Sequence, residues 1–104
     1  MTLVETLRAA RALVDTPEKW WQKNGHNSGA LGCTCTCAGL ALTDAPTDYE
    51  RERFAARRFF ASTLGLDVGQ LATAVFEWND APERTHADVL AAFDKAIEAA
   101  EAQA

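Results

Sequence analysis

The stretch Trp78-Asn79-Asp80-Ala81-Pro82-Glu83-Arg84-Thr85 separates two segments with helical periodicity, and the rest of the chain is organised around it. Trp78 follows an apolar run and is expected to be mostly buried, with its indole N–H bonded to an acceptor. Asn79 and Asp80 favour a turn held by side-chain hydrogen bonds, and Pro82 fixes one backbone dihedral angle within it. The stretch therefore predicts a rigid turn between two helices.

The end of this stretch predicts the start of the last helix. Thr85 precedes Asp88 by three residues, which is the spacing of a helix N-cap and a carboxylate that bonds an unpaired backbone N–H. Apolar residues then recur at helical spacing, at Val89, Leu90, Phe93, Ile97 and Ala100. We expect a helix from His86 to about residue 102.

Helix start signals also mark the N-terminal part of the chain. Thr2-Leu3-Val4-Glu5 has the spacing of a capping box and predicts a helix over about residues 3–14. Thr16-Pro17-Glu18 predicts a short second helix that carries Trp20 and Trp21, one of them in the core.

The middle of the chain predicts three further helices. Residues 32–43 are expected to be helical, although the alternation of Cys and Thr at its start also suits a strand. A helix over about 48–64 should end at Gly65, and another should run from about residue 67 to Phe76. We therefore expect an all-α fold, a compact single domain of five or six short helices over residues 1–104.

The aromatic residues of the 48–64 helix give conflicting indications of its buried face. Phe54, Ala61 and Leu64 lie near one line along the helix. Phe59 and Phe60 are adjacent and must point to different sides. We expect this helix to be buried on more than one face or to contribute to an oligomer contact.

The charge and the hydropathy of the chain exclude several kinds of partner. Acidic residues outnumber basic ones 15 to 10, giving a net charge of −5, so nucleic-acid binding is not expected. No stretch has the roughly 20 apolar residues of a membrane span, and the first residues lack the pattern of a secretory signal. The expectation is a cytoplasmic protein without a nucleic-acid or membrane partner.

The three cysteines raise the question of a metal site. Cys33, Cys35 and Cys37, with His26 or His86, could supply the Cys and His ligands of tetrahedral zinc. Their alternating spacing matches no standard zinc motif, and on a helix only Cys33 and Cys37 would share a face. We expect reduced, buried thiols, no metal and no cofactor.

The polar residues around the central stretch allow two interpretations. In one, Trp78, Asn79, Asp80, Arg84 and His86 form a ligand-binding cluster, together with Cys35. In the other, which we favour, caps and turns explain all of these residues except His86, and Arg84 reaches back to Asp80 or Glu83. The chain also has no hydrolase, phosphate-loop or zinc-protease motif, so an enzyme is the less favoured class.

One segment of the sequence carries a resemblance to a known group of proteins. It has the pattern Trp-Asn-Asp-x-x-x-Arg-Thr-x-x-x-Val-Leu-x-x-Phe-x-x-Ala, matched by Trp78, Asn79, Asp80, Arg84, Thr85, Val89, Leu90, Phe93 and Ala96. With this pattern, the chain resembles a domain family of unknown function found in small proteins of actinobacteria and their phages. A central Cys-x-x-Gly-Ala-Leu-like segment of that family is matched only loosely, by residues 35–40. The resemblance implies a bacterial or phage origin and no particular activity.

The sequence leaves two functions open. The favoured one is a small interaction or regulatory protein that binds another protein, because the chain is acidic, lacks catalytic motifs and has many large apolar residues. A homodimer also stays open. The alternative is a small-molecule or metal-binding protein, which could also be an enzyme. Its site would consist of Asn79, Asp80, Arg84 and His86 with Cys35.

Overall fold

The structure is a computed structural model that describes residues 2–20 and 50–103, apart from the side chains of Leu71 and Ala72. Within these ranges it contains helices and no β-strand, which confirms the all-α prediction there. The elements are α1 (Leu3–Ala12), the 3-10 helix η1 (Pro17–Lys19), α3 (Glu50–Thr63), the 3-10 helix η4 (Val68–Gln70), α4 (Leu71–Asp80) and α5 (His86–Ala102). The helix predicted for residues 32–43 and Trp21 lie outside the described residues. The described residues contain four α-helices, whereas five or six helices were expected for the whole chain.

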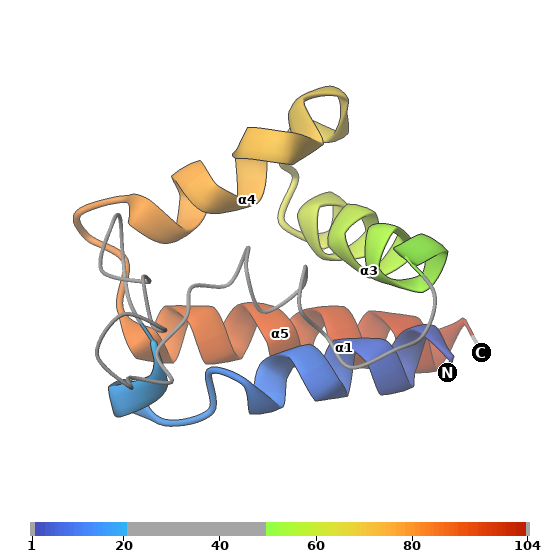
Figure 1. Ribbon diagram of the computed structural model, residues 1–104, viewed down its shortest axis with the longest axis horizontal. Helices are drawn as coiled ribbons and strands as arrows, with labels where there is room; N and C mark the ends of the chain where they lie inside the picture. Colours follow the sequence, from blue (N-terminus) through green and yellow to red (C-terminus); the bar gives the residue numbers. More distant parts are fainter. Residues whose placement is uncertain (1, 21–49, 104) are drawn as a thin grey trace.

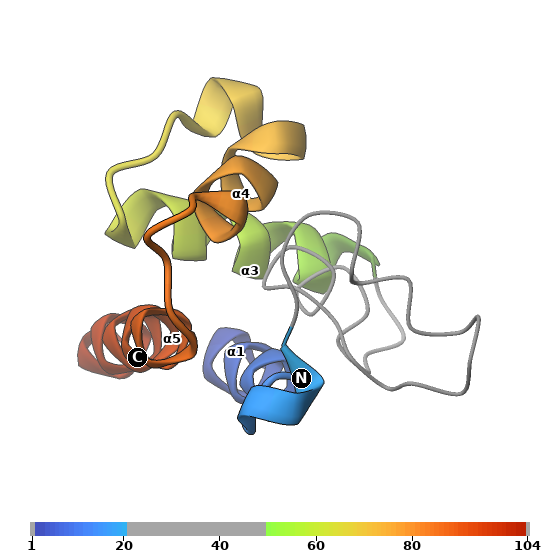
Figure 2. The ribbon, with the colours of Figure 1, turned by 90° about the vertical axis from the view of Figure 1, so that its left-hand side faces the viewer.

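The helices pack in layers (Figures 1 and 2). α1 and α5 lie side by side and run antiparallel, so the start of α1 and the end of α5 are at the same end of the pair (Figure 1). α3 crosses over both of them, and α4 packs on α3 on the side away from this pair (Figure 2). Two ion pairs, Arg8 with Glu101 and Arg11 with Asp94 at 2.8 Å, join the exposed edges of α1 and α5.

Both predicted capping boxes are present. The Thr2 hydroxyl accepts from the Glu5 N–H at 3.1 Å, and the Glu5 carboxylate accepts from the Thr2 N–H at 2.8 Å. Thr85 and Asp88 make the same reciprocal bonds at the start of α5, at 3.1 and 3.0 Å. These bonds satisfy backbone N–H groups that a helix start leaves unpaired. They fix the starts of α1 and α5, the two helices that lie side by side as one layer of the fold.

Gly65 ends α3 as predicted. Its φ angle is +72°, a left-handed conformation that glycine adopts without steric cost. The N–H of Leu66 donates to the Ala61 carbonyl oxygen at 3.0 Å, and the N–H of Gly65 donates to the Ser62 carbonyl oxygen at 3.1 Å. This pair of bonds is a Schellman motif, and it turns the chain from α3 toward η4 and α4.

Phe60 lies at the centre of the core. Its ring centroid is 4.7 Å from that of Phe93 on α5, and its ring meets Trp78 of α4 edge-on at 5.8 Å. The other large buried side chains come from α1, α4, α5 and the segment after α1: Leu7, Val14, Val75 and Val89. One aromatic residue of α3 therefore connects both layers of the fold.

The aromatic residues differ in how far they are covered. Phe54, placed on one line with Ala61 and Leu64, is 46% exposed, whereas Ala61 is buried. η4 and α4 both contact α3, so one side of this helix is covered while Phe54 stays exposed. Trp78 is partly buried and packs against the core, which agrees with the expectation that most of it is covered. Phe59 is also half-buried, as expected for a helix with more than one packed side.

The predicted turn also begins later than expected. α4 continues through Asn79 and Asp80 instead of ending near Phe76. The Asn79 side chain is buried and bonded inside the protein, so tertiary contacts outweigh its preference for turns. α1, by contrast, ends at Ala12 instead of residue 14, and η1 replaces the predicted second helix. No helix of the described ranges has the length and apolar character needed to cross a membrane.

Substitution of Phe60 tests the central position of this residue. We expect Phe60→Ala to lower the free energy of unfolding by about 3–5 kcal/mol, because it removes a fully buried ring between two layers. Phe54→Ala on the same helix should change it by no more than about 0.5 kcal/mol, since Phe54 is exposed. Urea unfolding of both variants measures this difference, and equal losses would contradict the assignment.

The pH dependence of stability offers a second test, at the start of α3. Hydrogen bonds from Arg57 at 3.1 Å and Arg53 at 3.2 Å hold the pKa of the Glu50 carboxyl below its ordinary value of 4.5. A lowered folded-state pKa contributes stability that is present above the ordinary value and lost as the pH falls through the folded-state value. Glu50→Gln should therefore destabilise the protein at about pH 7 and have a smaller effect at about pH 3.

The matched control for this test is Glu77→Gln. Glu77 is exposed on α4 and makes no ion pair with any described residue. Urea unfolding of both variants at the two pH values measures the effect. If Glu50→Gln has the same small effect at both pH values, the bonds to Arg57 and Arg53 contribute no stability in solution.

Candidate functional site

The five residues predicted as a ligand-binding cluster surround the junction of α4 and α5, but they form two groups. Asn79 and His86 contact Trp20, which follows η1. Trp78 and Arg84 contact each other. Asp80 accepts a hydrogen bond from its neighbour Asn79 at 3.1 Å. These contacts divide the predicted cluster between two sets of partners.

Asn79 is held by a hydrogen bond to Trp20. The Trp20 indole N–H donates to the Asn79 Oδ1 at 2.7 Å, and the Asn79 side chain is fully buried. The Asn79 Nδ2 then donates to Asp80. A buried amide without partners would cost about 1–3 kcal/mol, so these bonds are needed for Asn79 to occupy the interior. Asn79 joins the end of α4 to the segment that follows α1.

His86 makes a second connection to the same segment. Its Nε2 lies 2.7 Å from the main-chain carbonyl oxygen of Val14, and its ring centroid is 6.0 Å from that of Trp20. Because a carbonyl oxygen only accepts, Nε2 must carry a proton and donate it. His86 therefore fixes the start of α5 against the end of the α1 segment.

Arg84 reaches back along the chain, as predicted, but to a different partner. Its Nε–H donates to the main-chain carbonyl of Trp78 at 2.8 Å, and its guanidinium carbon lies 4.3 Å from the Trp78 ring centroid. The structure records no ion pair of Arg84 with Asp80 or Glu83, all three of which it describes. The last carbonyls of a helix lack intrahelical partners, and this arginine satisfies one of them. The expected partners Asp80 and Glu83 are therefore wrong.

The arrangement has consequences for the proposed ligand and metal sites. The Asn79 Oδ1 and the His86 Nε2 are bonded to other parts of the protein, which supports a structural role for both residues. Among the described residues no three His, Cys, Asp or Glu side chains are close enough to hold a metal ion. Cys33, Cys35, Cys37 and His26 lie outside the described residues. The alternative site built from the junction and Cys35 stays a prediction.

Trp20 is the junction residue that sequence reasoning missed. It was expected in the core only as one of an adjacent pair of tryptophans. Its bond to Asn79 spans 59 residues, and no periodicity or capping pattern links two positions so far apart. The sequence held one signal for this contact. Asn79 directly follows Trp78 near the end of an apolar helix, a position at which the amide side chain can be buried.

Comparison with known proteins adds a family. The sequence model of DUF6197, a family of unknown function, matches residues 1–99. The chain belongs to this family. The match extends over both sides of the junction, from α1 and Trp20 to most of α5. Membership of DUF6197 confirms the resemblance to a family of unknown function, while the taxonomic range and the tryptophan motif stay predictions. No curated protein and no solved structure matches the chain.

A double-mutant cycle at Trp20 and Asn79 tests the structural role of the junction. Trp20→Phe keeps an aromatic ring but removes the indole donor, so Asn79 loses this bond in a buried position. We expect the variant to lose about 1–3 kcal/mol of unfolding free energy. Asn79→Ala and the double variant should then show a coupling energy of about 0.5–3 kcal/mol.

Urea unfolding of the four proteins measures this coupling, with Glu83→Ala as a variant of an exposed residue in the same turn. Strictly additive losses would show that the hydrogen bond contributes nothing beyond its separate side chains.

Proposed function

We propose that the chain is a protein-binding module that holds its partner on the outward face of α3. Five exposed residues define this α3 face: Arg51, Phe54, Ala55, Arg58 and Ser62. The observation that carries the proposal is the exposure of Phe54, at 46%, between two arginines. Aromatic residues and arginine are enriched in protein interfaces, where they supply much of the binding energy.

The spacing of these residues makes the α3 face one continuous strip. Positions 51, 55, 58 and 62 follow each other at intervals of three or four residues, and position 54 lies three after 51 and four before 58, so the five form one broad side of the helix. Ala56 and Phe60 are buried on the other side of α3. The α3 face can therefore contact a partner without moving the core residues of the same helix.

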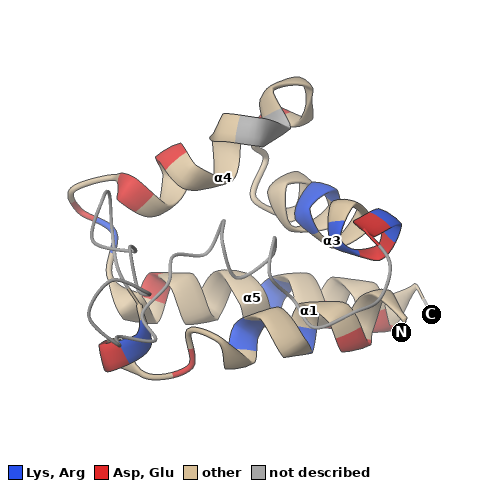
Figure 3. Ribbon diagram, viewed as in Figure 1, with Lys and Arg blue, Asp and Glu red and all other residues tan. Residues whose placement is uncertain are grey.

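The charges on α3 indicate the chemistry of the partner. Of the 10 basic residues of the chain, 4 lie on this helix, Arg51, Arg53, Arg57 and Arg58, although the net charge is −5 (Figure 3). Arg53 and Arg57 pair with Glu50. Arg51 and Arg58 make no ion pair with any residue in the described part of the chain. A partner surface with carboxylates around an apolar contact for Phe54 would complement this face.

Arg57 contributes to the same face from its edge. Its guanidinium carbon lies 5.7 Å from the centroid of the Phe54 ring, within the range of a cation–π contact. This contact limits the freedom of Phe54 before binding. A side chain that is already ordered loses less conformational entropy when a partner covers it. Exposure and partial ordering together make Phe54 suitable as an anchor.

The wider proposal keeps the expectations from the sequence. We place the protein in the cytoplasm of a bacterium or phage-infected cell, on the basis of the resemblance described above and its cysteine content. A second copy of the chain is the competing partner for the α3 face. The ligand-binding alternative at Asn79, Asp80, Arg84 and His86 is less well supported, because Asn79 and His86 are bonded internally.

Quantitative affinity capture from a lysate of the source cells tests the proposed partner surface. The wild type is compared with Phe54→Ala, Arg58→Glu and the control Val68→Ala, which truncates another exposed apolar residue, 38% exposed, outside the α3 face. A partner retained by the wild type and the control should bind Phe54→Ala and Arg58→Glu at least about 10-fold more weakly, since interface anchors typically contribute 2 kcal/mol or more.

Calorimetry with the purified partner then gives the dissociation constants. Equal binding by all four proteins would place the contact elsewhere on the molecule. Concentration-dependent dimerisation that Phe54→Ala abolishes would replace the partner with a second copy.

A further inference from the structure

A small recess lies at the junction of α4 and α5, on the side of Trp78 and Arg84 and not on the side of Trp20. There α5 meets the ends of α3 and α4. Its volume is about 270 Å³, and its lining includes Leu64, Trp78, Arg84, Asp88, Ala91 and Lys95. None of these residues belongs to the α3 face. The recess is therefore a separate surface feature, and what it binds does not depend on the proposed protein partner.

Arg84 presents a guanidinium group to this recess in a fixed position. The bond from its Nε to the Trp78 carbonyl and the contact of its guanidinium with the Trp78 ring hold the group at both its edge and its face. No described residue forms an ion pair with it. A planar guanidinium matches the two oxygens of a carboxylate, and a fixed one loses little entropy on binding.

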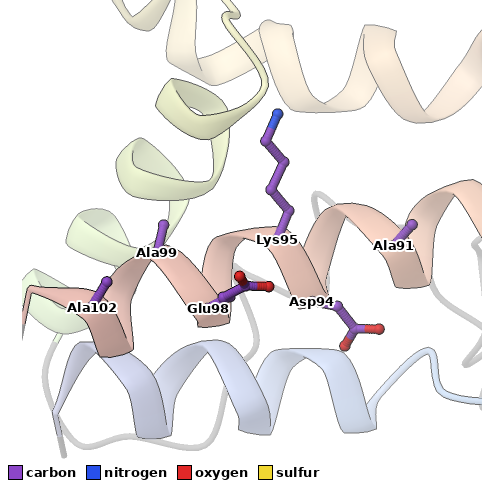
Figure 4. Close-up of a pocket in the computed structure, with 6 residues that line it drawn as sticks. All are labelled: Ala91, Asp94, Lys95, Glu98, Ala99 and Ala102. Atoms are coloured by element: carbon purple, nitrogen blue, oxygen red, sulfur yellow. The ribbon is translucent and has the colours of Figure 1, made fainter.

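Lys95 supplies the second positive charge. Figure 4 shows its side chain extending from α5 toward α3 and α4, whereas Asp94 points toward α1, where it pairs with Arg11. Lys95 makes no ion pair within the described ranges. Lys95 also lines the adjoining groove on α5, so its side chain borders both depressions.

The negative charge in the lining is already engaged. Asp88 accepts from the Thr85 N–H at 3.0 Å, and this bond belongs to the cap of α5. The lining named above thus carries two basic groups against one carboxylate with a structural role. Within this lining basic groups outnumber acidic ones, although the chain is acidic as a whole.

The remaining lining is apolar and partly aromatic. Leu64 and the Trp78 ring are half-buried and pack against the core, and Ala91 leaves space above α5. A volume of about 270 Å³ is slightly below the usual range of sites for drug-sized ligands, so the recess matches a small ligand. We propose that this recess binds a free, small aromatic carboxylate, with the carboxylate between Arg84 and Lys95 and the ring against Trp78 and Leu64.

A nuclear magnetic resonance titration with benzoate tests the proposal. The signals to follow in a ¹H–¹⁵N spectrum are the Trp78 indole N–H and the backbone amides of Arg84 and Ala91. Benzamide is the neutral isostere, and acetate carries the charge without the ring. We expect benzoate to shift these signals in a saturable manner, with an affinity at least ten-fold higher than that of benzamide or acetate.

Variants of Lys95 test whether its positive charge is needed for benzoate binding. Lys95→Met should weaken benzoate binding several-fold, and Lys95→Arg should restore it. Lys95 is exposed, so neither substitution removes a core contact. The matched control is Arg58→Met, which removes an exposed cation from α3 and should leave the benzoate affinity unchanged.

Several results would overturn the proposal. They are equal shifts with benzamide and benzoate, shifts confined to residues outside the recess, or an unchanged affinity in Lys95→Met. Tighter binding of N-acetylphenylalanine than of benzoate would overturn the assignment to a free small carboxylate and favour a polypeptide C-terminus. Loss of partner capture in the α3 variants does not bear on this site, so the two proposals fail independently.

Discussion

The hydrogen bond between Trp20 and Asn79 is the contact on which the arrangement of the helices most depends. Asn79 is fully buried, and an amide in the interior is tolerated only when its polar atoms find partners. The bond fixes the end of α4 against the segment after α1, and His86 fixes the start of α5 against the same segment through Val14. The turn between α4 and α5 is thereby held from inside, while Phe60 fills the space between the layers from α3.

The same junction has an inner and an outer side because neighbouring helical residues point about 100° apart. Asn79 faces Trp20, and its neighbour Trp78 faces Phe60 and Arg84. Arg84 closes the outer side by donating to a carbonyl at the end of α4, and its side chain also lines the surface recess. A short polar stretch thus has a structural role on one side and offers a binding surface on the other.

Local signals in the sequence predicted the parts of the fold that depend on local physics. The caps at Thr2 and Thr85 and the left-handed stop at Gly65 involve bonds between residues a few positions apart, and all three are confirmed. The length of α4, the exposure of Phe54 and the role of Trp20 were not predictable in this way. Each depends on what packs against a helix from a distant part of the chain. The candidate site itself stays a prediction, and the division of its residues into two groups became visible only in the tertiary structure.

Single helices of this small protein carry buried residues on one side and exposed residues on the other. The exposed residues can therefore serve a function while the buried ones keep the fold. A domain of about 100 residues has a modest stability margin, so substitutions at Phe60 or Asn79 act on the whole molecule. The outward residues of α3, and Lys95 on α5, are exposed, and substitutions there are expected to cost less. Both surfaces carry arginine or lysine without described ion pairs on an acidic chain. The overall charge repels anions at long range, so anionic partners would be selected by these local contacts and weakened by salt.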